Sequence, residues 1–327
     1  LLRLTTLPAV LAGAYCEPVP RDPGHTDRLI RRLRWEELDP AWLERLAGLA
    51  REEDLEGGGL LRRPTRVGDP TSGLLTTSDR ASARLVARGP VVVAGLGMIA
   101  PVLAAYGKAC AGRAVLRDGA RAARGDVLGV IEGPAPELLQ AERPLLNFIQ
   151  RLCGVATWTR RHVDAMGATP SLLLDTRKTT PGYRMLEKYA VGVGGGHNHR
   201  LGLFDRVMVK DNHLAAADGS DSGARILELV RRARAARPDL LIEVEVDRPD
   251  QIGPALASGA EVILLDNFPL ASLREAVPFV RGRAWCEVSG GVSLATLPEL
   301  GALGPDFISC GALTHAAPWA DVGLDWD

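Results

Sequence analysis

Short apolar segments recur at a regular spacing through the second half of the chain. They occupy residues 171–175, 206–210, 240–246, 261–266, 284–289 and 306–309. Helical patterns separate the later segments, at 250–259, 269–280 and 293–301. Apolar strands that alternate with short helices are typical of βα units around a parallel sheet. The pattern therefore predicts a six-stranded α/β barrel or open barrel.

The first half of the chain has a different pattern. Residues 39–55 show helical periodicity, and Asp39 is placed to cap that helix in front of Pro40. The remaining segments predict a loop at 60–80, short strands within 81–96 and 114–133, and a long helix from about 137 to 165. We therefore expect a separate N-terminal domain that combines helices and strands and ends near residue 150.

Composition excludes several classes of protein. The 327 residues include 39 Lys and Arg against 40 Asp and Glu, so the near-neutral charge argues against a nucleic-acid binder. Hydrophobic residues make up 46% of the chain, too many for a disordered protein. Since no uncharged apolar stretch approaches the length of a spanning helix, we expect no membrane partner.

The cysteines and the first residues bear on the compartment. The five cysteines are scattered without a CxxC pair, which predicts neither a zinc site nor a disulfide framework and favours a reducing, cytoplasmic location. Residues 1–16 contain one Arg and a short apolar run, as a secretion signal does, but two threonines and a proline interrupt the run. We therefore interpret this stretch as an ordinary N-terminal extension.

Lysine is rare in this chain, and its positions are informative. The four lysines are Lys108, Lys178, Lys188 and Lys210. Where a composition prefers Arg so strongly, a remaining Lys can mark a place that needs a compact ammonium. Three of the four lie between 178 and 210, together with His197 and His199. This segment is where we expect the chemistry.

The predicted strands also end in functional residue types. TRKTT, DNH, NF, GG and CGAL follow five of the apolar segments. Any single strand must end in polar residues, but five such endings together indicate a functional face. In α/β barrels the carboxyl ends of the strands form the active-site face.

Two segments, one of these endings and the glycine-rich stretch before His197, carry the strongest cations. Arg177 and Lys178 are adjacent after a strand, where Arg would bind a carboxylate or phosphate bidentately and Lys would act as a point charge. A solvated surface turn is the alternative. His197 and His199 form an H-x-H pair, but only His213 offers a possible third metal ligand, so we favour donors for an anion over a metal site.

The other endings suit a phosphorylated ligand. Ser289, Gly290 and Gly291, and the SCGAL sequence at 309–313, close the last two strands with small residues whose backbone amides would bind a phosphate. Glu243 and Glu245 alternate within one strand and so face the same side, with Lys178 or Lys210 as expected partners. With Asp266 they could bind ribose hydroxyls or Mg²⁺.

Long strings of this sequence resemble one enzyme family. They are ERPLLNFIQRLCGVAT (142–157), DTRKTTPGYRMLEKYAVGVGGGHNHRLGLFDRVMVKDNH (175–213), IEVEVD (242–247), VILLDNF (262–268), EVSGGV (287–292) and DFISCGALTH (306–315). From about residue 39 to 320 the chain is similar to quinolinate phosphoribosyltransferase, the carboxylating nicotinate-nucleotide pyrophosphorylase.

The resemblance implies a fold and an activity. The fold would be an N-terminal α/β sandwich domain followed by a six-stranded open α/β barrel, in a cytoplasmic homodimer. The implied limits are an extension at 1–38, a sandwich at 39–152 to which 308–327 returns, and a catalytic barrel at 153–307. The implied reaction, in NAD biosynthesis, converts quinolinate and phosphoribosyl pyrophosphate to nicotinate mononucleotide, CO₂ and pyrophosphate, with Mg²⁺ as cofactor.

The resemblance also implies roles for individual residues. Arg143 would reach into the site of the partner subunit. Quinolinate would be held by Arg177, Lys178, His199 and Arg200. The phosphoribosyl group would face Lys210, Glu245 and Asp266, of which the two acids would also meet Mg²⁺, mainly through the pyrophosphate. The phosphate would lie on Ser289, Gly290, Gly291, Ser309 and Gly311. The catalytic group would be Lys178, Lys210, Glu245 and Asp266.

Some features depart from the family pattern, and two other functions compete. Residues 57–67 look inserted, and Pro70 stands where an aliphatic residue is usual. One alternative is a related phosphoribosyltransferase for another pyridine carboxylate, which would need fewer cations. The other is a catalytically silent binding protein, which would have lost the charges at its strand ends; none has been lost here.

Overall fold

The computed structural model describes residues 28–76, 78–210, 212–213 and 222–327, which form two compact units. The barrel unit consists of Arg161–Thr180 and Gly196–His315, together with the described residues up to Arg31. The N-terminal unit consists of Arg32–Arg160, Pro181–Gly195 and Ala316–Asp327. Most of the expected extension, 1–27, lies outside the described residues, and the domain limits given above remain predictions.

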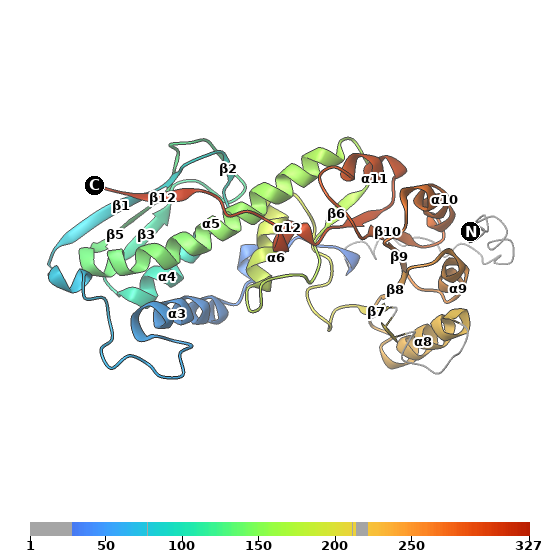
Figure 1. Ribbon diagram of the computed structural model, residues 1–327, viewed down its shortest axis with the longest axis horizontal. Coiled ribbons are helices and arrows are strands. Elements are labelled where there is room, and N and C mark those ends of the chain that lie inside the picture. Colours follow the sequence, from blue (N-terminus) through green and yellow to red (C-terminus); the bar gives the residue numbers. More distant parts are fainter. Residues whose placement is uncertain (1–27, 77, 211, 214–221) are drawn as a thin grey trace. The chain divides into compact units, whose positions relative to one another are not determined.

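The barrel unit contains one sheet of six parallel strands (Figure 1). In sheet order these are β6 (Leu172–Leu174), β11 (Phe307–Ser309), β10 (Trp285–Ser289), β9 (Val262–Asp266), β8 (Ile242–Val246) and β7 (Val207–Val209). All six lie within the segments predicted as strands. β6 and β7 form the two edges of the sheet, so the predicted open α/β arrangement is confirmed.

Helices separate these strands along the chain. They are α8 (Ser222–Ala236), α9 (Ile252–Ala257) preceded by the short η4 (Pro249–Gln251), α10 (Leu270–Val280) and α11 (Leu297–Leu303), and α12 (Ala312–His315) follows the last strand, β11. The strands are almost continuously apolar because helices and core cover both faces of a parallel sheet. β9, for example, buries its first four residues. Glu243 in β8 and Glu287 in β10 are exceptions, since both acids are fully buried.

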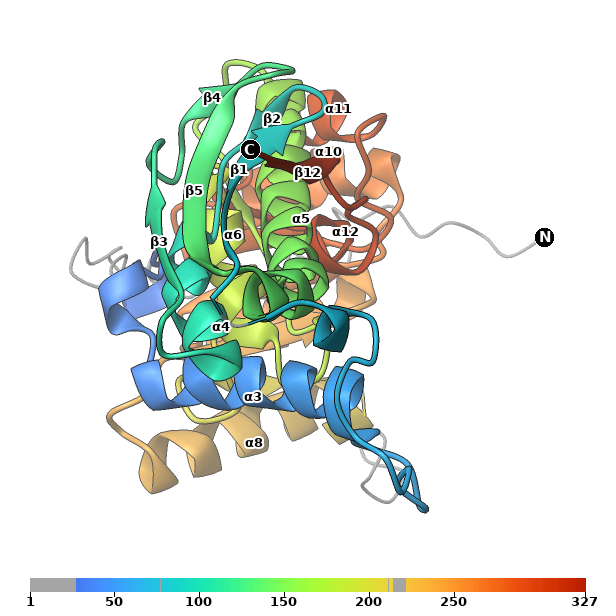
Figure 2. The ribbon, with the colours of Figure 1, turned by 90° about the vertical axis from the view of Figure 1, so that its left-hand side faces the viewer.

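The N-terminal unit is built around an antiparallel sheet. Its strands, in sheet order, are β12 (Val322–Trp326), β1 (Arg80–Ala87), β5 (Val127–Pro134) and β3 (Ala111–Ala114), and β2 (Val91–Val92) pairs separately with β4 (Arg121–Ala122). The long helix α5 (Ala135–Met166) runs along this sheet, as Figures 1 and 2 show. Its buried face includes Leu138, Leu145, Ile149 and Leu152, at helical spacing.

Helix α3 (Pro40–Glu56) begins and ends where the sequence predicts. The Asp39 side chain accepts a hydrogen bond from the Ala41 backbone N–H at 3.0 Å, and Gly57 ends the helix with a left-handed φ of 67°. The remaining short helices are η1 (Trp35–Glu37), η2 (Ser72–Leu74) and η3 (Leu96–Met98). Within the described ranges, no helix combines the length and apolar character needed to cross a bilayer.

Two further helices of this unit fall where the pattern predicts none. They are α4 (Ile99–Tyr106) and α6 (Arg184–Val193), and α8 of the barrel unit was also not predicted. The sequence of α4 is apolar almost throughout, so no polar stripe marks its period. In α6, residues 186–191 are all buried, including Glu187 and Lys188, so these charged residues do not mark a side that faces solvent.

Candidate active site

A cavity of about 590 Å³ lies at the carboxyl ends of the barrel strands. Every strand of the sheet contributes to it, because parallel strands end at the same edge. The predicted residues among its lining are Arg177, Lys178, His199, Arg200, Lys210, Glu245, Asp266, Ser289, Gly290, Gly291, Ser309 and Gly311. Arg143 is not among them: it lies exposed on α5 in the N-terminal unit.

The lining also includes residues that the sequence analysis did not single out for the site. These are Thr176, Met208, Leu264, Glu287, Val292, Ala312 and His315. Glu287 is the most informative of them. It belongs to the EVSGGV string, and an acid within an apolar strand is itself a signal that could have drawn attention to it.

Buried Asp175 positions the residues of the two segments that carry most cations. Its carboxylate accepts hydrogen bonds from Asn198 Nδ2 at 2.8 Å and from the His199 backbone N–H at 2.9 Å. These bonds attach residues 197–200 to Asp175, which follows β6 and lies two residues before Arg177. The Arg177 Nε is buried and has no hydrogen-bond partner among the described residues. A buried donor that lines a cavity in this way is suited to an anionic ligand.

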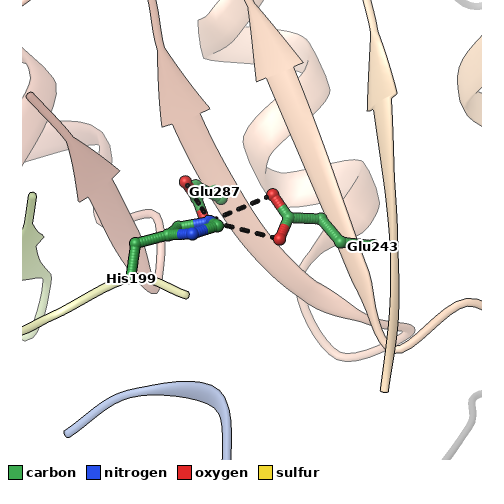
Figure 3. A group of neighbouring side chains, drawn as sticks. All are labelled: His199, Glu243 and Glu287. Atoms are coloured by element: carbon green, nitrogen blue, oxygen red, sulfur yellow. Dashed lines mark hydrogen bonds and ion pairs between the residues drawn. The ribbon is translucent and has the colours of Figure 1, made fainter. Parts of the chain in front are cut away.

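His199 belongs to a buried charge cluster that also contains Arg206, Glu243 and Glu287 (Figure 3 shows His199 with the two acids). His199 Nε2 lies 3.2 Å from Glu243 Oε2 and 3.4 Å from Glu287 Oε1. Arg206 NH1 lies 2.7 Å from Glu243 Oε2 and 3.1 Å from His199 Nε2. These side chains are at most 6% exposed, so the four charged groups compensate one another in place of water.

In this buried charge cluster, the neighbouring charges shift the pKa values of His199 and Glu243 in the direction opposite to the effect of burial. Burial alone would lower the pKa of His199, but Glu243 and Glu287 outweigh it and raise that pKa to about 9. The Arg200 backbone N–H, 2.7 Å from Nδ1, opposes this rise because it needs the lone pair of that nitrogen. For Glu243, burial would raise the pKa, and His199 and Arg206 lower it to about 2.

The same three side chains, His199, Glu243 and Glu287, have the donor types of a metal site, with ligand atoms within 4.8 Å of one another. The guanidinium of Arg206, however, already supplies a cation to this group. We therefore assign the cluster to ion pairing, consistent with the choice of anion donors over a metal for the H-x-H pair.

A second charged group, which we call the outer group, consists of Lys210, Glu245 and Asp266. Lys210 Nζ lies 2.5 Å from Glu245 Oε2, and this pair is 35% and 13% exposed. Burial raises the pKa of Glu245, and Lys210 opposes that rise. Lys210 is thus the partner expected for Glu245, whereas the partners of Glu243 are Arg206 and His199. Arg206 has no motif of its own, and only the structure identifies it.

The glycine-rich endings approach the outer group closely. Ser289 pairs with Asp266 in the register of β10 and β9, and Gly290 follows with a φ of 91°. Gly311 lies against the stem of Lys178, because an added Cβ would be 2.9 Å from Lys178 Cδ. Ser309 donates a hydrogen bond to Glu287 Oε1. The cavity therefore combines cations, two partly exposed acids and tight backbone turns.

Comparison with protein families gives two matches that together cover most of the chain. Residues 155–325 match the model of the quinolinate phosphoribosyl transferase C-terminal domain. Residues 69–153 match the model of the N-terminal domain of the same family. The first match alone spans more than half of the chain and includes all of the cavity residues named above.

Individual relatives agree with these matches. The chain is 42% identical over 281 residues to the nicotinate-nucleotide pyrophosphorylase [carboxylating] of Mycobacterium leprae, covering 84% of this chain and 94% of the relative. It is 40% identical over 259 residues to a probable enzyme of the same name from Bacillus subtilis, covering 79% and 88%. The solved nicotinate-nucleotide pyrophosphorylase from Francisella tularensis superposes with a TM-score of 0.80 at 32% identity, covering 89% and 98%.

Proposed function

This chain belongs to the quinolinate phosphoribosyltransferase family, and we propose that its cavity joins quinolinate to phosphoribosyl pyrophosphate. The products are nicotinate mononucleotide, CO₂ and pyrophosphate, so the enzyme is a decarboxylating pentosyltransferase of NAD biosynthesis. Both substrates are strongly anionic, and they fit a site whose cations follow β6 and β7 and also come from the segment that holds His199 and Arg200.

The observation that carries this proposal is the crowding of arginines around one cavity. Burial lowers the pKa of Arg200, and repulsion from Arg177 and Arg206 adds to the effect against the attraction of Glu243. Arg177 Nε is a buried donor without a partner among the described residues. A ligand with two carboxylates would relieve the repulsion and accept these donors. We assign quinolinate to Arg177, Lys178, His199 and Arg200.

The reaction needs positioning and charge more than acid–base catalysis. The pyridine nitrogen bonds to ribose C1 as the bond from C1 to the pyrophosphate oxygen breaks, through a state with positive charge on the ribose. Glu245 and Asp266 provide nearby carboxylates that stabilise this charge, and Lys210 fixes Glu245. The cationic ring nitrogen then stabilises the electron pair that stays on the adjacent ring carbon when CO₂ departs, and that carbon uses the pair to bind a proton.

The donor set of the outer group also fits Mg²⁺. Glu245 and Asp266 are oxygen ligands on neighbouring strands, and each already has one oxygen engaged, with Lys210 and with Asn267 Nδ2 respectively. Mg²⁺ keeps several waters and binds through one or two carboxylates together with substrate phosphates. When bound, it would neutralise charge on the departing pyrophosphate. We assign Glu245 and Asp266 to it, mainly through the substrate.

We extend the proposal to assembly and location. Arg143 is exposed on α5 in the other unit of its own chain, and we propose that it completes the site of a partner subunit in a homodimer. Ser289, Gly290, Gly291, Ser309 and Gly311 are assigned to the phosphate. We place the enzyme in the cytoplasm, because the four cysteines in the described ranges are free thiols.

The test is an assay of purified protein with Mg²⁺, phosphoribosyl pyrophosphate and quinolinate, followed for CO₂ and nicotinate mononucleotide. Nicotinate replaces quinolinate in a parallel reaction. We expect product from quinolinate alone and a loss of about 100-fold or more in kcat/KM for Arg177→Ala. A folded dimer that turns over nicotinate without CO₂ would instead identify an enzyme for another pyridine acid.

A further inference from the structure

Asn267 has an unusual backbone conformation directly beside the candidate site. It follows Asp266, the last residue of β9, and its φ is 56°. Among the described residues it is the only one with a left-handed φ that is not a glycine. The Cβ atom makes this conformation unfavourable because it approaches a backbone carbonyl oxygen, although asparagine tolerates it better than most residues. Such a residue next to a functional group calls for a functional explanation.

The contacts of Asn267 join two parts of the phosphoribosyl side of the cavity. Its backbone N–H donates to the Ser289 carbonyl at 3.0 Å, one residue beyond the pairing of Asp266 with Ser289. Its side-chain Nδ2 donates to Asp266 Oδ2 at 2.7 Å. Its Oδ1 lies against Gly290, where an added Cβ would be only 2.1 Å away. The reverse orientation of the amide would place Oδ1 against the Asp266 carboxylate.

These contacts restrict how the neighbouring groups can move. Asp266 is partly exposed, so its carboxylate would otherwise rotate freely in water. The bond from Nδ2 occupies Oδ2 and leaves the other oxygen for a ligand. On the opposite side, the amide packs against the turn at Gly290, so the carboxylate and the turn have a fixed spacing. Asn267 itself does not line the cavity.

We propose that Asn267 is a positioning residue that holds the Asp266 carboxylate and the Ser289–Gly290–Gly291 turn in register for phosphoribosyl pyrophosphate. This inference rests on the proposed function. It assigns a role to the left-handed conformation: only that conformation lets one side chain contact the preceding carboxylate and the neighbouring turn together. A neutral amide is required, because an acid at this position would repel both Asp266 and a phosphorylated ligand.

Two variants separate the side-chain contacts from the backbone conformation. Asn267→Gly keeps the left-handed backbone and removes both contacts, while Asn267→Asp keeps the shape and replaces the donor with a second carboxylate. We expect the KM for phosphoribosyl pyrophosphate to rise about three- to tenfold for Asn267→Gly and more for Asn267→Asp. The KM for quinolinate should stay within about twofold, because Asn267 contacts none of the residues assigned to it.

A structural role alone would give a different result. It would change both KM values together and lower the melting temperature, whereas we expect Asn267→Gly to melt close to the wild-type temperature because the strain that glycine relieves offsets the lost hydrogen bond. Ala271→Asp is the control, since it adds the same charge at an exposed position in α10 and should match the wild type. Wild-type KM values in both Asn267 variants would overturn the inference.

Direct binding keeps this test separate from that of the proposed function. Calorimetric titration of phosphoribosyl pyrophosphate with Mg²⁺, without any pyridine acid, should give a Kd about tenfold weaker for Asn267→Asp than for the wild type. Equal Kd values would sink the inference whichever pyridine the enzyme uses. No binding to the wild type would instead overturn the proposed function, and this inference with it.

Discussion

Two glutamates on one strand show how differently the same side chain can be used. Glu243 and Glu245 are two residues apart in β8 and face the same side of the sheet. Glu243 is fully buried with Arg206 and His199, whereas Glu245 pairs with Lys210, which is 35% exposed. Burial holds the pKa of Glu245 above its usual value, while the cations around Glu243 lower its pKa to about 2.

This difference separates stability from catalysis within a single cavity. The buried charge cluster has replaced water by fixed partners, so removing one member leaves another charge buried and uncompensated. The outer group is still in contact with solvent and with any ligand, so its charges remain available for chemistry. We therefore expect substitution of Glu243, which does not line the cavity, to change folding and substitutions in the outer group to change turnover.

The largest effect is expected from Glu243→Ala. This variant leaves Arg206 and His199 buried without their main carboxylate partner, which should lower the free energy of unfolding by about 3–5 kcal/mol. Glu245→Ala is the matched control on the same strand, with an expected loss of about 0–1 kcal/mol but a fall in kcat of about 100-fold. Urea denaturation and the product assay measure both. Similar stability losses would contradict the comparison.

The dependence of stability on acid pH sharpens the comparison of Glu243 with Glu245 further. Glu243 has a pKa of about 2 in the fold against an ordinary value of 4.5, so its contribution is fully present above pH 4.5 and is lost as the pH falls through about 2. Glu243→Gln removes this contribution and keeps the shape. The difference in unfolding free energy between wild type and variant should therefore be constant from about pH 6 to about pH 4.5 and shrink as the pH falls from there toward about 2. Urea denaturation from about pH 6 to about pH 3 tests this.

Ser309→Ala should give an intermediate effect. Ser309 donates to Glu287 Oε1, and Glu287 Oε2 has no hydrogen-bond partner within the described ranges. Loss of this donor should cost about 1–3 kcal/mol of unfolding free energy, seen as a lower melting temperature. Ser272→Ala, at a half-buried position in α10, should stay within about 0.5 kcal/mol. A wild-type melting temperature for Ser309→Ala would show that this bond does not stabilise the cluster.

The smallest effect on folding is expected from Gly311→Ala. The new Cβ meets the Lys178 stem at 2.9 Å, and a flexible stem can shift, so the free energy of unfolding should change by less than about 1 kcal/mol. Gly290→Ala should cost more, because its φ is 91° and its Cβ would overlap Asn267. For both variants the KM for phosphoribosyl pyrophosphate should rise. Urea unfolding curves of the two variants, measured together, show whether Gly290→Ala lowers the free energy of unfolding more than Gly311→Ala does.

Most of the scaffold could be predicted because the strands of a buried parallel sheet appear in the sequence as short, continuous apolar runs. VILLD became β9 and WCEVS became β10 within one residue of the expected limits. It also predicted which residues line the cavity, since strand endings in such a sheet meet at one edge. Helix α4 could not be predicted, because IAPVLAAY is apolar almost throughout and its exposed positions, Ala100 and Ala104, carry no polar side chain to mark the helical period.

The sequence by itself therefore determined the six parallel strands of the barrel unit, the α/β fold class, the family and the cations of the site. These depend on local patterns or on long, specific strings. Only the tertiary structure decided that Arg206 compensates Glu243, that Glu287 joins His199, and that Asn267 connects Asp266 to the Gly290 turn. The first two pairings join residues that are distant in sequence, so they form only when the chain has folded. The third depends on the left-handed backbone of Asn267, which no sequence pattern shows.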